Sequence, residues 1–307
     1  MYFLDGRSQD DIARVIGTSR SNVSRMLTAA RAQGVVEIRV HGQIARSGEL
    51  EQALRERFGL AHVRVASFQP GMDAQEAAGE LAARWLDETL CDGSVLGLSW
   101  GTSLQAMVSA VLVDQPRSVE VVPLVGGLKT AESLVAGQEL VRELAGRLGA
   151  TYRYLHAPAL LHSKTVRQAL LTEPAIREVM ARARSADIAM VGVGTVGRGS
   201  SNEIVDGLGL TAAERKAFQA AGPVGDTCCR FFDAEGRPIH GVVHDRVIAV
   251  ECEELAEIPT VIGVATGVVK APGVRGAVRG GIIDGLITDA GLALALLGGT
   301  SPDGQGG

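Results

Sequence analysis

Short apolar segments alternate with longer helical segments along most of the chain, and this alternation constrains the fold more than any other feature. The segments that have the character of buried strands are residues 95–98, 119–125, 187–193, 247–251, 261–265 and 283–288. Strands that alternate with helices form βαβ units, which join into a mostly parallel sheet with helices on both faces. We therefore expect an α/β fold with a doubly wound sheet, whose ligands bind beyond the carboxyl ends of the strands.

The composition fits a globular protein with more than one domain. A chain of 307 residues is long enough for about two domains, and apolar residues make up 46% of it. Its longest apolar stretch, residues 261–269, is broken by two glycines and a threonine, so no membrane partner is expected. Residues 1–11 carry charges where an export signal would be apolar, which predicts a cytoplasmic protein.

The cysteines and histidines do not form a recognisable metal or disulfide pattern. Cysteines stand at positions 91, 228, 229 and 252 without a CxxC pair, so we expect buried thiols. His240 and His244 stand four residues apart, but the Gly-Val-Val between them favours a strand or turn over the helix that would bring them together. The sequence therefore predicts no metal and no other cofactor.

Charge is distributed unevenly along the chain, whose formal net charge is −5. Residues 1–46 hold seven arginines against four acidic residues, whereas the rest of the chain holds 23 basic and 31 acidic residues. A basic N-terminal segment joined to an acidic body suits a segment that meets an anionic partner. Nucleic acid is the first candidate for that partner.

The basic segment has the pattern of two short helices with a tight turn. Ser8 and Asp11 form a capping pair at the first helix, and Gly17 is suited to end it. Ser19 is placed to cap a second helix that ends at Gly34. The expected apolar positions of the two helices are Ile12, Ala13, Val15, Ile16, Val23, Met26, Leu27 and Ala30.

The spacing of Ala13, Gly17 and Val23 is typical of a helix-turn-helix, which needs a small residue at the helix crossing, a glycine in the turn and an apolar anchor. Small polar and basic side chains on the second helix suit the major groove of DNA. The residues predicted to bind DNA are Ser19, Arg20, Ser21, Asn22, Ser24 and Arg25. Residues 35–40 alternate as a strand that could form a wing beside DNA. The alternative is a purely structural helical hairpin.

The predicted domain boundaries follow from these patterns. Residues 1–42 form the helix-turn-helix domain, and residues 43–58 form a linker with an amphipathic helix. Residues 59–299 form the larger effector-binding domain, and residues 300–307 form a disordered tail.

The turn after the first predicted strand of the body is the best candidate for an anion site. It contains Ser99, Gly101, Thr102 and Ser103, whose hydroxyls and amides can hold a phosphate at a helix N-terminus. Ordinary helix capping by Thr102 or Ser103 is the alternative. Gly126 and Gly127 after the next strand allow close approach of the backbone, which supports a ligand site.

Residues 192–197 match the glycine fingerprint of dinucleotide-binding proteins. That fingerprint needs a helix to begin within the glycines, whereas we expect residues 198–202 to continue as a loop that carries Arg198. A strand that ends in an acid also does not follow at the usual distance. We therefore do not predict a nicotinamide cofactor.

The sequence resembles the SorC family of bacterial sugar-responsive transcriptional regulators. The resemblance lies in residues 2–13, 19–27 and 30–36 of the head, and in 97–102, 191–194, 225–226, 231–233, 263–270 and 286–289 of the body. It implies a body with the fold of ribose-phosphate isomerase and glucosamine-phosphate deaminase. Because family members usually have another helix before Tyr2, we also expect a start upstream of Met1 or a trimmed head.

The resemblance implies that the body binds a phosphorylated sugar. The phosphate is expected near residues 99–103, the sugar hydroxyls near Asp226, and a positive charge from Lys270. Gln138 stands where many relatives have Asn, and Val125 stands where some have the lysine of a Schiff base, which excludes that bond here. The residues predicted to bind the effector are Ser99, Gly101, Thr102, Ser103, Gly126, Gly127, Gln138, Arg198, Asp226 and Lys270.

We therefore expect a DNA-binding transcriptional regulator of a carbohydrate operon, not an enzyme. Its partners would be operator DNA, a phosphorylated sugar and further copies of the chain in a homodimer or homotetramer, because paired heads must match two half-sites. One alternative is a sugar-phosphate isomerase or deaminase with an incidental head. Another is a binding protein that has lost its contact with DNA.

Overall fold

Contacts divide the chain into two units, residues 1–43 and 44–307, which are described separately. The computed structural model describes residues 1–2, 7–32, 44–68, 71–112, 116–128, 137–197 and 199–298. The amphipathic helix that we assigned to the linker is α3 (Gly48–Phe58), and it belongs to the larger unit. It packs against β1 (His62–Ala66) and α13 (Ala290–Leu297).

In the smaller unit, α1 (Gln9–Ile16) and α2 (Arg20–Ala32) are joined by a tight turn, as predicted. The Ser8 hydroxyl accepts a hydrogen bond from the Asp11 amide at 3.1 Å, and Gly17 ends α1 with a φ of 69°. The Ser19 hydroxyl accepts from the Asn22 amide at 3.2 Å and caps α2. The predicted helix end at Gly34 and the wing strand over residues 35–40 lie outside the described residues.

The predicted apolar faces of these two helices are only partly correct. Ile12, Ala13 and Val23 are buried together at the helix crossing. The structure contradicts the prediction for Val15 and Ile16 of α1 and for Met26 of α2, whose exposed fractions are 55%, 45% and 55%. Two crossed helices contact each other along a narrow stripe, so positions beside that stripe need a further element to cover them.

The larger unit is built on a parallel sheet in which, among the described residues, seven strands are joined. Its strands in spatial order are β1, β10 (Gly285–Asp289), β9 (Thr260–Val264), β5 (Ile188–Gly192), β2 (Val95–Leu98), β3 (Glu120–Pro123) and β4 (Thr151–Tyr152). Each neighbouring pair is parallel, which confirms the predicted α/β fold.

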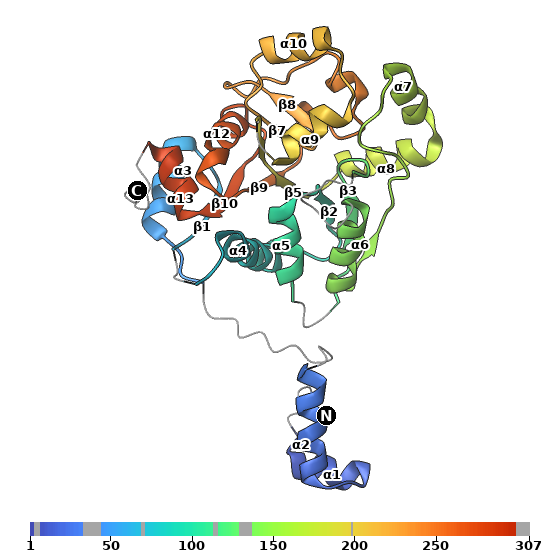
Figure 1. Ribbon diagram of the computed structural model, residues 1–307, viewed down its shortest axis with the longest axis vertical. Coiled ribbons are helices and arrows are strands. Elements are labelled where there is room, and N and C mark those ends of the chain that lie inside the picture. The colour runs from blue at the N-terminus through green and yellow to red at the C-terminus, as the bar shows by residue number, and fades with distance from the viewer. Residues whose placement is uncertain are drawn as a thin grey trace. The chain divides into compact units, whose positions relative to one another are not determined.

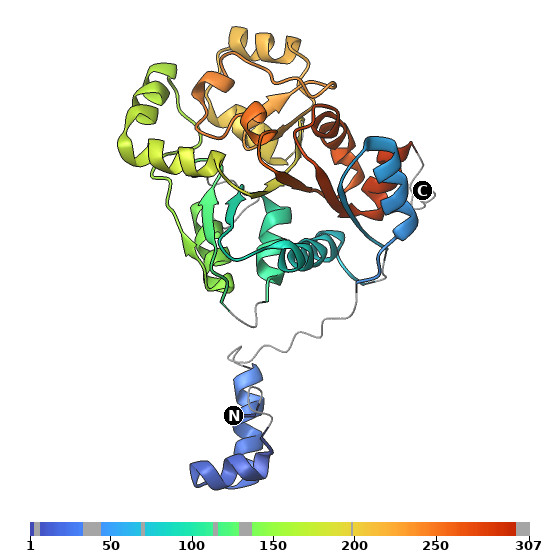
Figure 2. The same cartoon turned by 180° about the vertical axis from the view of Figure 1, so that it is seen from behind.

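Helices cover both faces of this sheet (Figures 1 and 2). One face carries α4 (Ala74–Thr89), α5 (Thr102–Ala110) and α6 (Gly137–Leu148), and the other carries α3, α8 (Pro174–Arg184), α12 (Ala271–Arg279) and α13. Side chains of one strand alternate between the two cores, because Ile188 and Met190 pack into the first and Ala189 and Val191 into the second.

A small antiparallel sheet lies beside the second face and consists of β6 (Gly194–Thr195), β7 (Gly225–Thr227) and β8 (Arg230–Phe232). The remaining described elements are α7 (Lys164–Thr172), α9 (Gly199–Gly207), α10 (Ala212–Ala220), η1 (His244–Arg246), α11 (Cys252–Leu255) and η2 (Val268–Lys270). None of the helices in the described part of the chain has both the length and the apolar character that crossing a bilayer needs.

The prediction of a strand over residues 247–251 is wrong. Val247 and Ala249 make only isolated antiparallel bridges, to Leu160 and Val125 respectively. The segment changes partner along its length, because the Ile248 amide donates to the Ala159 carbonyl and the Val250 amide donates to the Leu124 carbonyl, so neither bridge continues into a ladder. The carbonyls of Val247 and Ala249 accept hydrogen bonds from the buried Arg230 side chain.

The prediction of a loop over residues 198–202 is also wrong, because α9 begins at Gly199. The glycine fingerprint still does not form a dinucleotide turn. Gly194 and Thr195, in the middle of the fingerprint, form β6 and pair antiparallel with β7. A dinucleotide site would need these glycines to turn directly into a helix.

Candidate functional site

The order of the strands places a crevice between β2 and β5. After β2 the chain moves to β3 on one side, and after β5 it moves to β9 on the other side. The loops that follow the two strands therefore diverge, and such a switch point is where open α/β sheets bind ligands. A cavity of about 550 Å³ lies there.

Five segments from distant parts of the sequence form the cavity. They are the first turn of α4, the turn after β2, the segment from the end of β5 into α9, the β7–β8 hairpin, and the loop that includes η2. The lining residues are Gln75, Ser99–Ser103, Gly192–Thr195, Gly197, Gly199–Asn202, Asp226, Cys228, Cys229, Thr266, Val269 and Lys270.

The N-terminus of α5 lies in the wall of the cavity. No side chain caps this helix at its N-terminal residue Gly101, so its first amides remain available to a ligand. The hydroxyl of Ser103 and the indole N–H of Trp100 are buried, and neither has a partner among the described residues. Buried donors without partners are rare, and both residues belong to the lining of a cavity whose wall includes a helix N-terminus, which is suited to an anion.

Asp226 is a buried carboxylate in the wall of the cavity. Its Oδ1 accepts a hydrogen bond from the Ser201 hydroxyl at 2.5 Å. Burial raises the pKa of Asp226 to about 6, although the Ser201 hydrogen bond and the charge of Lys270 oppose the rise. Gly194 is needed beside this pair, because a Cβ there would overlap both Asp226 Oδ1 and Ser201 Oγ.

A strained turn of two adjacent cysteines joins β7 to β8 and lines the cavity. Cys228 and Cys229 have φ values of 50° and 60°, in the left-handed region that favours glycine. Such residues cost about 1–3 kcal/mol each and persist only where their surroundings hold them. Burial raises the pKa of the Cys228 thiol to about 12 and also raises that of Cys229, so both are neutral.

The structure brings most of the predicted effector residues together. Those that line the cavity are Ser99, Gly101, Thr102, Ser103, Asp226 and Lys270. The Ser99 hydroxyl also accepts a hydrogen bond from the Gly192 amide at 3.1 Å, which ties the two diverging loops to each other. Arg198 lies outside the described residues.

Gly126, Gly127 and Gln138 do not line the cavity. A Cβ on Gly126 would lie 2.6 Å from the backbone of Pro158 and Ala159, so the backbone that approaches this glycine belongs to the protein itself. Gln138 accepts a hydrogen bond from the Leu155 amide at 3.1 Å. These residues support the strand ends behind the site.

Several cavity residues escaped the sequence analysis. Gln75 comes from the first turn of α4, and Val269 comes from η2. The adjacent cysteines gave no signal of a turn, since two-residue hairpins normally use Asn-Gly or Asp-Gly. Gly225, Asp226 and the two phenylalanines of β8 were recognised as family motifs, and a hairpin between them could have been inferred from that spacing.

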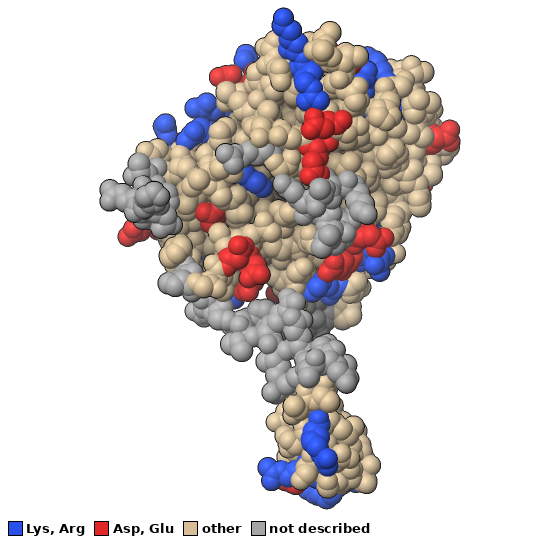
Figure 3. Space-filling model, viewed as in Figure 1, with Lys and Arg blue, Asp and Glu red and all other residues tan. Residues whose placement is uncertain are grey.

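In the smaller unit, the predicted DNA-binding residues differ in their local contacts. Ser19 caps α2, and the Asn22 side chain donates a hydrogen bond to Thr18 Oγ1 at 2.8 Å. Arg20 lies 3.9 Å from Asp10. The remaining candidates, Ser21, Ser24 and Arg25, are exposed on α2. Figure 3 shows basic side chains on the surface of this unit.

Comparison with known proteins identifies the larger unit. Residues 42–298 match the family described as "Putative sugar-binding domain". The chain is 32% identical to the deoxyribonucleoside regulator of Bacillus subtilis, over 97% of this chain and 95% of that protein. It is 30% identical to the sorbitol operon regulator of Klebsiella pneumoniae, again over 97% and 95%.

Solved structures agree with these relatives. The full-length sorbitol operon regulator SorC of Klebsiella pneumoniae superimposes with a TM-score of 0.74 at 29% identity, over 96% of both chains. The sugar-binding domain of a transcriptional repressor from Vibrio fischeri gives a TM-score of 0.75 at 29% identity, over 82% of this chain and 98% of that one.

The fold, the cavity at its switch point and the relatives together define a transcriptional regulator with a sugar-binding domain, rather than an isomerase or deaminase. The chain belongs to the SorC family, as its sequence motifs predicted.

Proposed function

We propose that the cavity binds a phosphorylated sugar and that this effector controls binding of the α1–α2 unit to operator DNA. The observation that carries the proposal is the N-terminus of α5, where Ser103 Oγ and Trp100 Nε1 are buried without described partners. Both are donors, as are the free amides of the first helical turn, so the site favours an anion.

A sugar phosphate fits the other walls of the same cavity. Asp226 can accept hydrogen bonds from sugar hydroxyls, and Lys270 adds a positive charge in the same wall. The Trp100 and Val269 side chains offer apolar surface to the carbon skeleton of a sugar. A phosphate at α5 and hydroxyls at Asp226 together account for both polar ends of the cavity.

The α1–α2 unit supplies the DNA contact in this proposal. Arg25 and its exposed neighbours Ser21 and Ser24 on α2 face the bases, and Arg20 contacts phosphates. Ser19 and Asn22 support this surface through the cap and the turn that they hold. One short helix reads few base pairs, so we propose a homodimer or homotetramer that places two heads on paired half-sites, in the cytoplasm where the operon lies.

Titration calorimetry with the full chain tests the effector site. A panel of pentose and hexose phosphates is compared with the unphosphorylated sugars and with inorganic phosphate. We expect one sugar phosphate to bind, and Thr102→Ala to weaken it by the 1.5–3 kcal/mol or so that a hydrogen bond to a charged group contributes. Thr172→Ala, at the end of α7 and away from the cavity, is the control.

Equal affinity of Thr102→Ala and Thr172→Ala for the sugar phosphate would show that the phosphate does not bind at the N-terminus of α5. Failure of every sugar phosphate to bind the folded wild-type chain would contradict the proposed effector class.

A further inference from the structure

Arg230 is a buried cation that follows the strained cysteine turn directly. Its side chain is 2% exposed, and Arg230 pairs with Thr227 across the hairpin. Burial of a guanidinium is costly unless hydrogen bonds satisfy it, so a buried arginine at this position requires a dedicated set of acceptors.

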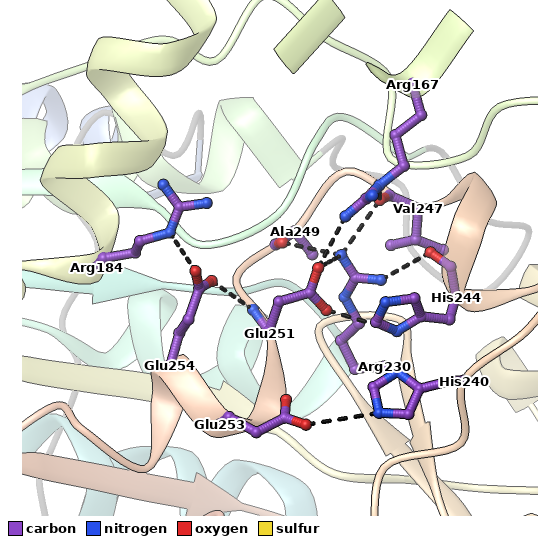
Figure 4. Close-up of polar contacts among 10 residues, drawn as sticks. All are labelled: Arg167, Arg184, Arg230, His240, His244, Val247, Ala249, Glu251, Glu253 and Glu254. Carbon is purple, nitrogen blue, oxygen red and sulfur yellow. Dashed lines mark hydrogen bonds and ion pairs between the residues drawn. The ribbon is translucent and has the colours of Figure 1, made fainter. Parts of the chain in front are cut away.

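The acceptors come from one segment, residues 244–251, which begins with η1 and ends at Glu251 (Figure 4). Arg230 Nη1 donates to the His244 carbonyl at 2.9 Å, and Nη2 lies within 3.2 Å of the Val247 and Ala249 carbonyls. Nη2 also donates to Glu251 Oε1 at 2.8 Å. Four acceptors on one segment hold the guanidinium, and with it the start of β8, in a single place.

A second arginine connects this cluster to the outer helix α7. Arg167 Nη2 donates to the same Glu251 Oε1 at 2.8 Å, and its Nε donates to the Val247 carbonyl (Figure 4). Glu251 therefore bridges two guanidinium groups, one from α7 and one from the hairpin. Without Arg167, Glu251 Oε1 and the Val247 carbonyl would each lose one of their two arginine donors, and α7 would no longer help to fix the acceptors of Arg230.

The other side of the cysteine turn is fixed by the sheet. Thr227 Oγ1 donates to the Gly192 carbonyl at 3.0 Å, at the end of β5, and Asp226 accepts from Ser201. The hairpin is thus anchored at Asp226 and Thr227 on the cavity side and at Arg230 on the outer side. Between these anchors lie only Cys228 and Cys229, whose left-handed backbone no other described residue except glycine adopts.

We propose that Arg167, Glu251 and Arg230 are positioning residues that hold the Cys228–Cys229 turn in the conformation that lines the effector cavity. The ion pair between Arg167 of α7 and Glu251 then influences the affinity of the cavity for its effector, although neither residue lines the cavity. This role rests on the proposed function only for the identity of the effector, because the state of the hairpin can be measured without a ligand. Binding sites generally need such outer residues to hold the lining residues in place.

The test compares Arg167→Met with Arg147→Met in the full chain. Arg147 lies in α6, pairs with Glu143 at 2.9 Å and donates to the carbonyls of Ser109 and Val111, so it resembles Arg167 in bonding both a glutamate and backbone carbonyls. It belongs neither to the cavity lining nor to residues 244–251, so it controls for the general loss of an ion pair. Arg167→Lys keeps the charge beside Glu251 and serves as the conservative variant.

Hydrogen exchange of residues 225–232 without ligand is the first readout. We expect exchange in this hairpin to be at least roughly tenfold faster in Arg167→Met than in Arg147→Met, with similar melting temperatures and with most of the protection restored in Arg167→Lys. Equal hairpin exchange in the two methionine variants would overturn the positioning role, whether or not any sugar phosphate binds.

Effector affinity is the second readout, for the sugar phosphate that binds the wild-type chain. Arg167→Met is expected to weaken binding of this sugar phosphate by about tenfold, or about 1.4 kcal/mol, relative to Arg147→Met. Faster hairpin exchange with unchanged effector affinity would also overturn the proposal, because the turn would then not matter for the site.

Discussion

At the scale of a single residue, Asp226 lowers the stability of the folded state for the sake of the binding site. The carboxylate is buried in the cavity wall, and its pKa of about 6 means that burial disfavours the charged form. Near neutral pH the residue is mostly ionised, so the folded state bears the cost of a buried charge. A ligand hydroxyl that donates to Asp226 would reduce that cost.

Asp226→Asn should make the stability of the protein less sensitive to pH. The pKa of Asp226 rises on folding from 3.8 to about 6, so its protonated form stabilises the fold fully below pH 3.8, and this contribution is lost as the pH rises through 6. Asparagine keeps an acceptor for Ser201 but does not ionise. The free energy of unfolding of the variant relative to wild type should therefore increase between pH 4 and pH 7, by at most about 3 kcal/mol.

Urea unfolding at pH 4, 5, 6 and 7 measures this difference. A difference that stays constant over this range would show that Asp226 titrates normally and that its environment is not as described.

At the scale of single elements, two helix glycines have opposite environments. Gly79 lies in α4, where a Cβ would be 2.7 Å from the backbone of Ala106 in α5. Gly146 lies in α6, where a Cβ would meet nothing within 4 Å. The first glycine allows α4 and α5 to pack closely, and the second has no packing role.

Gly146→Ala should stabilise the protein by about 0.5–1 kcal/mol, because alanine loses less backbone entropy in a helix than glycine does. Gly79→Ala should instead destabilise it, since the backbone of α5 must move away. Urea unfolding of the two variants at pH 7 measures both effects. Destabilisation by both substitutions, or by neither, would contradict the described packing of α4 on α5.

Individual strands differ in how well the sequence predicts them. Residues 95–98 form β2 with the predicted bounds, because an apolar run between turn residues is typical of a fully buried strand. Residues 247–251 have the same apolar character, yet their amides bond to two separate segments, at Ala159 and Leu124, and two of their carbonyls bond to Arg230. Local patterns do not reveal such a long-range partner. The strand β1 was missed, and its His62 and Arg64 interrupt the apolar run.

For the site, the turn at residues 99–103 was predictable because a short hydroxyl-rich turn between a strand and a helix has few other roles. The turn at Cys228 and Cys229 was not, because its backbone conformation is imposed by contacts on both sides of the hairpin. Gly126 and Gly127 were assigned to the ligand site because glycines indicate that another group approaches the backbone closely. The sequence does not show whether that group is a ligand or, as for Gly126, another part of the protein.

At the scale of the whole molecule, the chain combines a sugar-binding domain with a basic α1–α2 unit, and in the proposed function the sugar-binding domain controls the α1–α2 unit. The cavity can favour one state of the regulator only if the sugar phosphate binds that state more tightly. Arg25 of α2 tests the DNA contact separately, since it contacts DNA in the proposed function and lies outside the sugar-binding domain.

The most direct test is a gel-shift titration of the intergenic DNA upstream of the gene, at a stated salt concentration, with and without a panel of sugar phosphates. We expect specific binding of this DNA, and we expect one sugar phosphate to change it. Arg25→Ala should weaken DNA binding, and Thr102→Ala should make it less responsive to the effector. No binding at any salt concentration, or binding that every sugar phosphate leaves unchanged, would contradict the claim that a sugar phosphate controls DNA binding.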